Sequence, residues 1–236
     1  TPPGLVSAFA YASTPEHRPY FTMEFFDGVP INQFFADGFR PELTSVTLQL
    51  LQALDRIHAQ GLIHCDLKPQ NILVAGEATS RNPEPEAGGL KLEAGVVRVK
   101  LLDFGLAGRL ALSDSAVPRG TLGYVAPEVL KGVDVDARAD LYSLGLVLYE
   151  VVSGRGPGKE KDLRAWLRMQ YDTEFKAPRE FDKDIPEEFE ALVMSLIQRE
   201  PERRPRSAAA VSEELSRPGQ RLPADAEPRE SIVAPG

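Results

Sequence analysis

The stretch that decides the fold is Ile63-His64-Cys65-Asp66-Leu67-Lys68-Pro69-Gln70-Asn71-Ile72-Leu73-Val74. It places an acid, a cation and an amide at steps of two and three residues, between apolar anchors. Transfer of a phosphoryl group needs such a set: a carboxylate to orient a hydroxyl and accept its proton, a cation beside the migrating charge, and an oxygen ligand for magnesium. The pattern over residues 62–74 is too irregular for one helix or one strand, so we predict a strand, a polar loop and a second strand.

A second carboxylate, Asp103, follows Asn71 by 32 positions. Residues 96–102 alternate apolar and basic side chains, which predicts a half-exposed strand that leads directly into Asp103-Phe104-Gly105. Magnesium prefers hard oxygen donors and keeps water ligands, so one amide and one carboxylate can suffice beside nucleotide phosphates. Asn71 and Asp103 are therefore the candidate metal ligands.

These motifs, in this order, resemble those of the protein kinase family. Residues 64–71 are similar to its catalytic loop, Asp103-Phe104-Gly105 to its Asp-Phe-Gly motif, and Ala126-Pro127-Glu128 to its Ala-Pro-Glu motif. The lysine within the loop and the Gly120-Thr121 element resemble the serine/threonine branch. The resemblance covers residues 5–216 and implies an α+β, protein-kinase-like fold with a mainly helical C-lobe and a truncated small β lobe.

The resemblance also implies a role for each matching residue. Asp66 would be the catalytic base, and Lys68 the cation beside the transferred phosphoryl group. Asn71 would be a magnesium ligand and Asp103 the chief magnesium ligand. Thr121 would form a hydrogen bond near Asp66 and Lys68. The cofactors implied are ATP and Mg²⁺, and the substrate implied is a serine or threonine hydroxyl of a protein.

The adenine site follows from the same resemblance. Residues 20–28 look like the last strand of the small lobe and the hinge. Met23 stands at the gatekeeper position, and the backbone of Glu24 and Phe26 would face adenine. Leu73 would close the adenine pocket from below.

Other matches imply positioning rather than chemistry. Asp140 resembles the buried aspartate that braces the catalytic loop through its backbone. Glu128 and Arg204 resemble the pair that fixes the end of the activation segment to the lower helices. Cys65 stands where most members have the arginine that receives an activation-loop phosphate, so regulation by such a phosphate is not expected here.

The remaining sequence predicts two short antiparallel strands followed by a helical body. The strands are expected over residues 4–11 and 20–26. A short helical turn is expected over 32–36. An amphipathic helix opens at Pro41 and closes near Gly61, with apolar side chains at 43, 46, 50, 54 and 57. Further helices are predicted at 137–152, 160–170, 187–198 and 207–215.

The chain divides into a remnant of the small lobe with the hinge (1–28), a C-lobe (29–216) and a disordered tail (217–236). Residues 75–95 are rich in glycine, proline and acids, and are expected to be a mobile insertion. A glycine-rich phosphate loop and a phosphate-binding lysine are missing before Gly4. We therefore expect a truncated domain with little activity alone, and a two-stranded remnant that is marginal unless it leans on the helical body.

Composition excludes several other classes. The net charge of −8 repels a polyphosphate backbone, so no nucleic-acid partner is expected. A single cysteine among 236 residues cannot form an internal disulfide, which favours a reducing, cytoplasmic compartment. The most apolar stretch, residues 141–152, is shorter than the roughly 20 residues that cross a bilayer. Residues 1–11 lack a signal-peptide pattern, and the first residue is Thr1, so the chain is expected to be a fragment.

Two other functions stay open beside the kinase. A pseudokinase-like interaction module would bind partners without chemistry, although it has no need to keep Asp66, Asn71 and Asp103. A small-molecule kinase shares the base and magnesium arrangement but lacks the peptide platform that the Ala-Pro-Glu motif shapes. His64 is interpreted as a hydrogen-bonded core residue, and His58 has no partner that suggests chemistry. Cys65 is interpreted as an inert rather than a reactive thiol.

Overall fold

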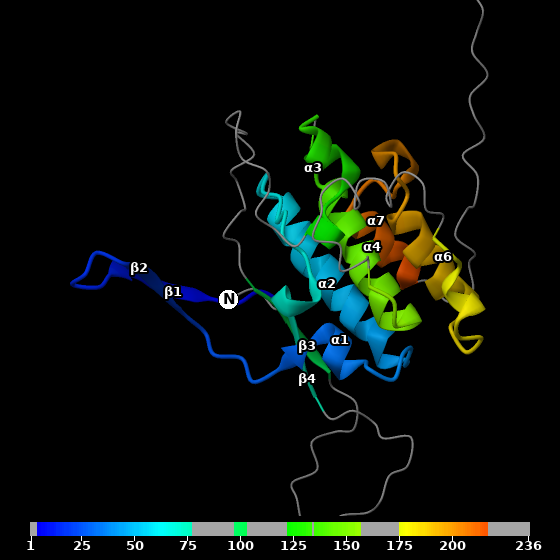
Figure 1. The fold of residues 1–236 in the computed structure, drawn as a ribbon, viewed down its shortest axis with the longest axis horizontal. Coiled ribbons are helices and arrows are strands. Elements are labelled where there is room, and N and C mark those ends of the chain that lie inside the picture. The colour runs from blue at the N-terminus through cyan, green and yellow to red at the C-terminus, as the bar shows by residue number, and fades with distance from the viewer. Residues whose placement is uncertain (1–3, 77–96, 103–121, 134, 157–174, 217–236) are drawn as a thin grey trace, which may run out of the picture.

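The computed structural model describes residues 4–76, 97–102, 122–133, 135–156 and 175–216 (Figure 1). Its strands are β1 (Ala8–Ser13), β2 (Pro19–Met23), β3 (Val29–Pro30), β4 (Ile72–Ala75) and β5 (Arg98–Leu101). Its α-helices are α1 (Ile31–Phe34), α2 (Glu42–His58), α3 (Pro127–Lys131), α4 (Arg138–Ser153), α6 (Glu187–Leu196) and α7 (Ala208–Leu215). Short 3₁₀ turns are η1 (Pro69–Asn71), η2 (Leu122–Tyr124), η3 (Pro178–Glu180) and η4 (Pro201–Arg203). Helices with small sheets confirm the predicted α+β class.

The helical body is built around α4, whose residues 139–149 are all buried. A helix that is buried on every side needs neighbours on every side, and α6, α1 and η2 all pack against it. The contact with α6 is close at Gly145, where an added Cβ would lie 2.7 Å from the Cβ of Leu196. Glycine is thus required there for the two helices to approach. The first turn of α4 carries Asp140 toward the candidate site.

Helix α2 confirms the predicted amphipathic pattern. Its apolar side chains at positions 43, 46, 50, 54 and 57 are all buried. One side of α2 packs against α7, and another lies along β5. Helix α7 begins at Ser207, whose Oγ accepts a hydrogen bond from the backbone N of Ala210 at 3.2 Å. The helices predicted near 187–198 and 207–215 are confirmed with α6 and α7.

A three-stranded antiparallel sheet, ordered β3-β4-β5, lies against the helical body. Its inner face is formed by Ile72, Val74, Val99 and Leu101, which are all buried. The outer edge of β5 is covered by Gln49 of α2. Its Nε2 donates to the carbonyl of Val97 at 2.8 Å, and its Oε1 accepts from the N–H of Val99 at 3.3 Å. The side-chain amide thus takes the place of a further strand.

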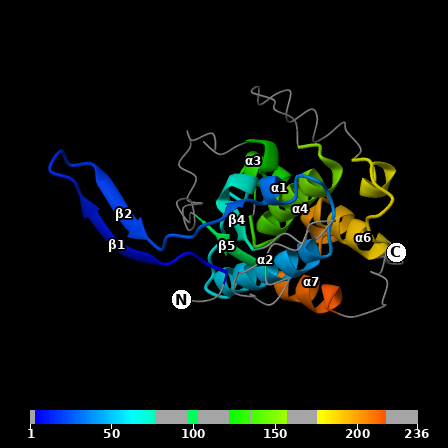
Figure 2. The same cartoon turned by 90° about the horizontal axis from the view of Figure 1, so that it is seen from below.

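Strands β1 and β2 form a separate antiparallel hairpin that projects away from the helical body (Figures 1 and 2). It carries exposed aromatic side chains, including Phe9 at 70% and Tyr11 at 76% exposure. The segment before β1 pairs with the end of β5: Leu101 N donates to Gly4 O at 2.8 Å, and Val6 N donates to Leu101 O at 3.3 Å. The base of the hairpin is therefore attached to the helical body through β5. A two-stranded hairpin needs such a contact because it is marginally stable alone.

Two strand predictions need correction. The hairpin strands are shifted: β1 extends to Ser13, and β2 ends at Met23, so residues 24–26 form an irregular connection. Residues 62–74 contain one strand, β4, rather than two. Residues 62–68 are not a strand because two of their N–H groups donate to the carboxylate of Asp140 instead of a partner strand.

Several predictions fall on parts of the chain outside the described residues. These are the helix at 160–170, the tail at 217–236 and most of the insertion at 75–95, of which residues 75 and 76 are described. Within the described residues, no helix combines the length and the apolar character needed to span a bilayer.

Candidate active site

The loop that carries Asp66 is held from below by a buried carboxylate. Asp140, which is fully buried, accepts hydrogen bonds from the N–H of His64 to Oδ2 at 2.8 Å and from the N–H of Cys65 to Oδ1 at 2.9 Å. The bracing role that the resemblance implied for Asp140 is confirmed. A third donor, Nε2 of His58, lies 2.8 Å from Oδ2. Burying a carboxylate is costly unless such donors satisfy it, so this anchor is fixed in one geometry.

Asp66, Lys68 and Asn71 come together in one cluster. Lys68 Nζ lies 2.7 Å from Asp66 Oδ2. Asn71 Nδ2 donates to the same oxygen at 3.0 Å and to the backbone carbonyl of Asp66 at 2.8 Å. The turn η1 produces this arrangement, because Pro69 at its start folds the chain back and brings the amide of Asn71 over Asp66.

A second set of bonds ties the loop to the end of β5. The N–H of Leu102 donates to the carbonyl of Asn71 at 2.8 Å. Nε2 of His64 lies 3.0 Å from the carbonyl of Leu102, and its Nδ1 accepts from the N–H of Asp66 at 3.3 Å. His64 is fully buried, so the interpretation as a hydrogen-bonded core residue is confirmed. The strand that these bonds fix leads directly to Asp103, which lies outside the described residues, as does Thr121.

A buried ion pair joins α3 to the end of the helical body. Arg204 Nη1 and Nη2 donate to the two carboxylate oxygens of Glu128 at 2.6 and 2.9 Å. The side chain of Arg204 is fully buried, and it also donates to three backbone carbonyls. The pairing expected of these two residues is confirmed. The pair joins α3 to the residue directly after η4 and, through the carbonyl of Arg138, to the start of α4.

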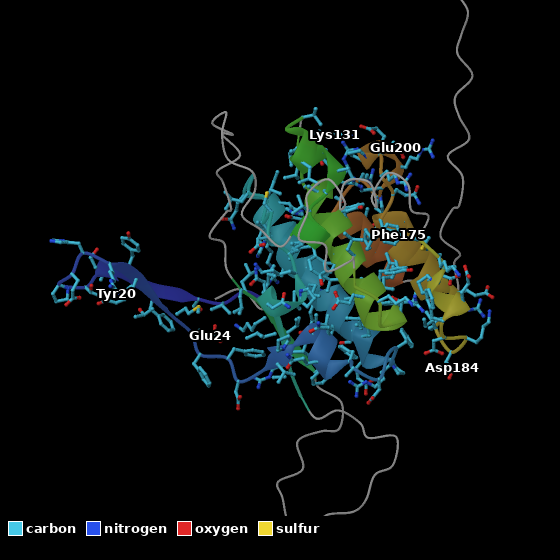
Figure 3. The ribbon with its side chains drawn as sticks, viewed as in Figure 1. Tyr20, Glu24, Lys131, Phe175, Asp184 and Glu200 are labelled. Carbon is cyan, nitrogen blue, oxygen red and sulfur yellow. The ribbon has the colours of Figure 1, made fainter. Side chains whose placement is uncertain are left out.

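The residues expected at the adenine site belong to the end of the hairpin, the segment that follows it, and the sheet. Met23 ends β2 and is 47% exposed. Glu24 stands at the base of the hairpin (Figure 3). Its N–H donates to the carbonyl of Ser7 at 2.8 Å, and its Oε2 lies 3.0 Å from Nζ of Lys100. That hydrogen bond from Lys100 lowers the pKa of the Glu24 carboxyl. Leu73 is half-buried on the adjoining strand, β4.

The sequence matches the protein kinase domain family over residues 3–215. The chain belongs to the protein kinase family. A probable serine/threonine-protein kinase of Streptomyces coelicolor is 33% identical to this kinase domain over 198 residues, covering 80% of the chain and 27% of that protein. The serine/threonine-protein kinase Pkn1 of Myxococcus xanthus is 32% identical over 219 residues, covering 89% of the chain and 29% of that protein. The kinase domain thus spans less than a third of the length of these two relatives.

A solved structure shows the same fold. The crystal structure of the Rad53 kinase domain and SCD2 superimposes with a TM-score of 0.67 at 25% identity, covering 92% of this chain and 73% of that one. Together with the curated relatives, it assigns this kinase domain to the Hanks-type serine/threonine kinases.

Two residues of the kinase domain, His58 and Glu150, make polar contacts that were not predicted from sequence. His58 has a partner after all, Asp140, and the two are 82 positions apart. Glu150 interrupts the apolar run of α4, and it accepts hydrogen bonds from the hydroxyl of Tyr124 and from Nδ2 of Asn32, the latter at 3.0 Å. Burial, together with the Glu150 carboxylate, raises the pKa of Tyr124. The only signal in the sequence for the contacts of Glu150 was its charge within an otherwise apolar run.

Cys65 adopts a left-handed backbone, with φ of 61°, directly before the candidate base. It is half-buried. Burial, with the nearby carboxylates of Asp140 and Asp66, raises the pKa of its thiol to about 12. A raised pKa disfavours the thiolate, which is the nucleophilic form, so the geometry favours an inert thiol.

We expect Cys65 to react slowly with iodoacetamide at pH 8 in the folded kinase domain. A thiol with a pKa of about 12 is ionised in roughly one molecule in ten thousand at that pH, against about a quarter for a free cysteine. The folded rate should therefore be on the order of a thousandfold below the rate in urea, and should rise about tenfold per pH unit up to pH 10. Because this is the one cysteine of the chain, mass spectrometry reads the rate directly. Equal rates with and without urea would show that the thiol is not shielded.

Proposed function

We propose that this kinase domain transfers the γ-phosphoryl group of ATP to a serine or threonine hydroxyl of a protein, with Mg²⁺. The observation that carries the proposal is the cluster of Asp66, Lys68 and Asn71, held on a loop that Asp140 braces. The three side chains supply the base, the cation and the oxygen donor that this reaction needs, within one hydrogen-bonded group.

Asp66 is the base in this proposal. Among the described residues, both side-chain donors that reach its carboxylate bind Oδ2, which leaves Oδ1 to orient the substrate hydroxyl and accept its proton. Lys68 is 2.7 Å from Oδ2 and has a flexible stem, so its ammonium can move toward a bound phosphoryl group. There it would stabilise the charge that develops on the phosphoryl oxygens.

The donor set fits a magnesium ion. The amide nitrogen of Asn71 is taken by Asp66, so its oxygen, a hard donor, is the atom available to a metal. Asp103, which follows the end of β5 by two residues, would supply a carboxylate oxygen. When bound, Mg²⁺ neutralises charge on the phosphates of ATP. The role of these two residues is to hold it beside the loop that carries Asp66.

The hinge and the surface around α3 support the choice of ATP and of a protein substrate. The N–H of Glu24 is used by Ser7, so Glu24 would offer adenine its carbonyl, and Phe26 would offer its N–H. Leu73 would contact the ring from β4. The Glu128–Arg204 pair holds the segment after Ala126 rigidly, as a surface that positions an extended peptide must be held. A single cysteine favours the cytoplasm as the compartment.

The test is magnesium-dependent transfer of labelled phosphate from ATP to a generic basic protein. Transfer should require Mg²⁺, stop when EDTA is added, and appear on serine and threonine after acid hydrolysis of the product. Where the gene encodes residues before Thr1, a form that includes them is assayed beside the chain. If neither form transfers phosphate or binds nucleotide, the kinase proposal is wrong, and the pseudokinase-like interaction module takes its place.

A further inference from the structure

The outer face of the β3-β4-β5 sheet carries two side chains that lie opposite each other. Leu73 of β4 pairs with Lys100 of β5 in the antiparallel register, so the two project from the same face. Both are half-buried, whereas their neighbours along each strand are buried against the helices. Lys100 is therefore on the face that the proposed function assigns to adenine, beside the residue that would contact the ring.

Lys100 holds the hinge to this face. Its Nζ lies 3.0 Å from Oε2 of Glu24 and donates to the carbonyl of Leu5 at 2.9 Å. The side chain of Lys100 is 16% exposed and that of Glu24 is 31% exposed, so the pair is partly shielded from water. The N–H and Oγ of Ser7 also lie within 3.4 Å of the same carboxylate oxygen. One ammonium thus joins β5, the hinge and the segment before β1.

A second cation on β5 contacts the hinge two residues farther along. The guanidinium of Arg98 lies 5.9 Å from the ring centroid of Phe26, within cation–π range. Side chains two apart on a strand project from the same face, so Arg98 and Lys100 form one row. Their partners, Phe26 and Glu24, are also two apart. The residues held by this row are the two whose backbone groups would bind adenine.

We propose that Lys100, assisted by Arg98, is a positioning residue for the nucleotide: it fixes the hinge backbone at Glu24 and Phe26 relative to β5. The proposal rests on the proposed function, because it takes the hinge as the adenine site. Since β5 runs on toward Asp103, the same strand sets the adenine end of the site and leads to its metal end. In this role Lys100 acts through the hinge backbone and not on the phosphates or the substrate hydroxyl.

Removing the contact between Lys100 and Glu24 should make the hinge backbone less preorganised for adenine. A hinge that is free to move must be ordered when adenine binds, and that ordering weakens binding. The chemical step depends on Asp66 and Lys68, whereas among the described residues the ammonium of Lys100 bonds to Glu24 and to the carbonyl of Leu5. Loss of the contact between Lys100 and Glu24 should therefore raise the KM for ATP and leave kcat nearly unchanged.

The experiment compares Lys100→Met with Lys100→Arg and with the matched control Lys176→Met, which removes an exposed lysine whose ion pair is 4.0 Å long. We expect Lys100→Met to raise the KM for ATP and the dissociation constant of a fluorescent ATP analogue by roughly threefold to fivefold, with kcat within about twofold. Lys100→Arg, which keeps a donor and the charge, should stay close to the parent, and so should Lys176→Met. Arg98→Gln should give a smaller rise.

A double variant tests whether the effect passes through Glu24. If it does, Glu24→Gln alone weakens nucleotide binding, and Lys100→Met with Glu24→Gln is no weaker than Lys100→Met alone. Thermal unfolding of each variant separates a local effect from general destabilisation. If the parent binds nucleotide and Lys100→Met binds it equally well, the positioning role is wrong and the proposed function stands. If neither the parent chain nor the form with residues before Thr1 binds nucleotide, the proposed function is wrong, and the positioning role is wrong with it.

Discussion

Replacing Asp66 with asparagine should lower the rate of phosphoryl transfer by about a hundredfold to ten-thousandfold, the range typical of a lost general base. The amide has nearly the shape of the carboxylate, so the turn η1 and the fold of the loop should survive. An amide oxygen cannot accept a proton from the substrate hydroxyl, and it gives Lys68 a neutral partner in place of a charged one at 2.7 Å. Because the defect lies in the chemical step, kcat should fall far more than the KM for ATP rises.

The matched control is Asp37→Asn, which makes the same chemical change at an exposed position before α2. It should leave kcat, KM and the melting temperature near those of the parent. Labelled-phosphate transfer gives the rates, and titration with a fluorescent ATP analogue shows whether Asp66→Asn still binds nucleotide. If Asp66→Asn kept more than a tenth of the parent kcat, Asp66 would not be the base, and the cluster would need another reading.

The parts of the site that could be predicted are those encoded by local sequence. Asp66, Lys68 and Asn71 lie within six residues, and the amphipathic period of α2 is visible in the positions of its apolar side chains. The family resemblance supplied two contacts between distant segments, the Glu128–Arg204 pair and the bracing of the loop by Asp140. The polar contacts between distant segments that neither local pattern nor resemblance indicated could not be predicted. His58 meets Asp140 across 82 positions and Lys100 meets Glu24 across 76, and neither spacing leaves a mark in the sequence.

The strand wrongly predicted before Asp66 has the same origin. The segment has the pattern of a strand because it carries apolar residues at Leu62 and Ile63. The prediction failed because a pattern of side chains does not show what the backbone N–H groups bind. Here the N–H groups of His64 and Cys65 donate to the carboxylate of Asp140, a residue of α4. A side chain thus replaces a partner strand, as Gln49 does at the outer edge of β5. In both places a side chain satisfies backbone groups that would otherwise need a neighbouring strand.

The second large effect concerns stability. Glu128→Ala should lower the free energy of unfolding by about 3–5 kcal/mol, the cost of leaving a buried charge without its partner. The side chains of Arg204 and Glu128 are 0% and 5% exposed, so water cannot take the place of the carboxylate. Arg204 cannot lose its proton, and its ring contact with Tyr142, 4.6 Å from the centroid, does not compensate a full charge. Urea denaturation followed by circular dichroism measures the loss.

The double variant Glu128→Leu with Arg204→Met separates the ion pair from the rest of the arginine's bonds. It removes both charges, so it should be destabilised by less than the sum of the two single variants. Some loss must remain, because Arg204 also donates to the carbonyls of Gln198, Arg138 and Arg199, which the methionine leaves without that donor. Arg203→Ala is the control, since that arginine is 71% exposed and its pair with Glu200 is 3.8 Å long; it should change stability by no more than about 0.5 kcal/mol. A loss below about 1 kcal/mol for Glu128→Ala would mean that α3 is held by its apolar contacts, and that the pair does not fix the segment after Ala126.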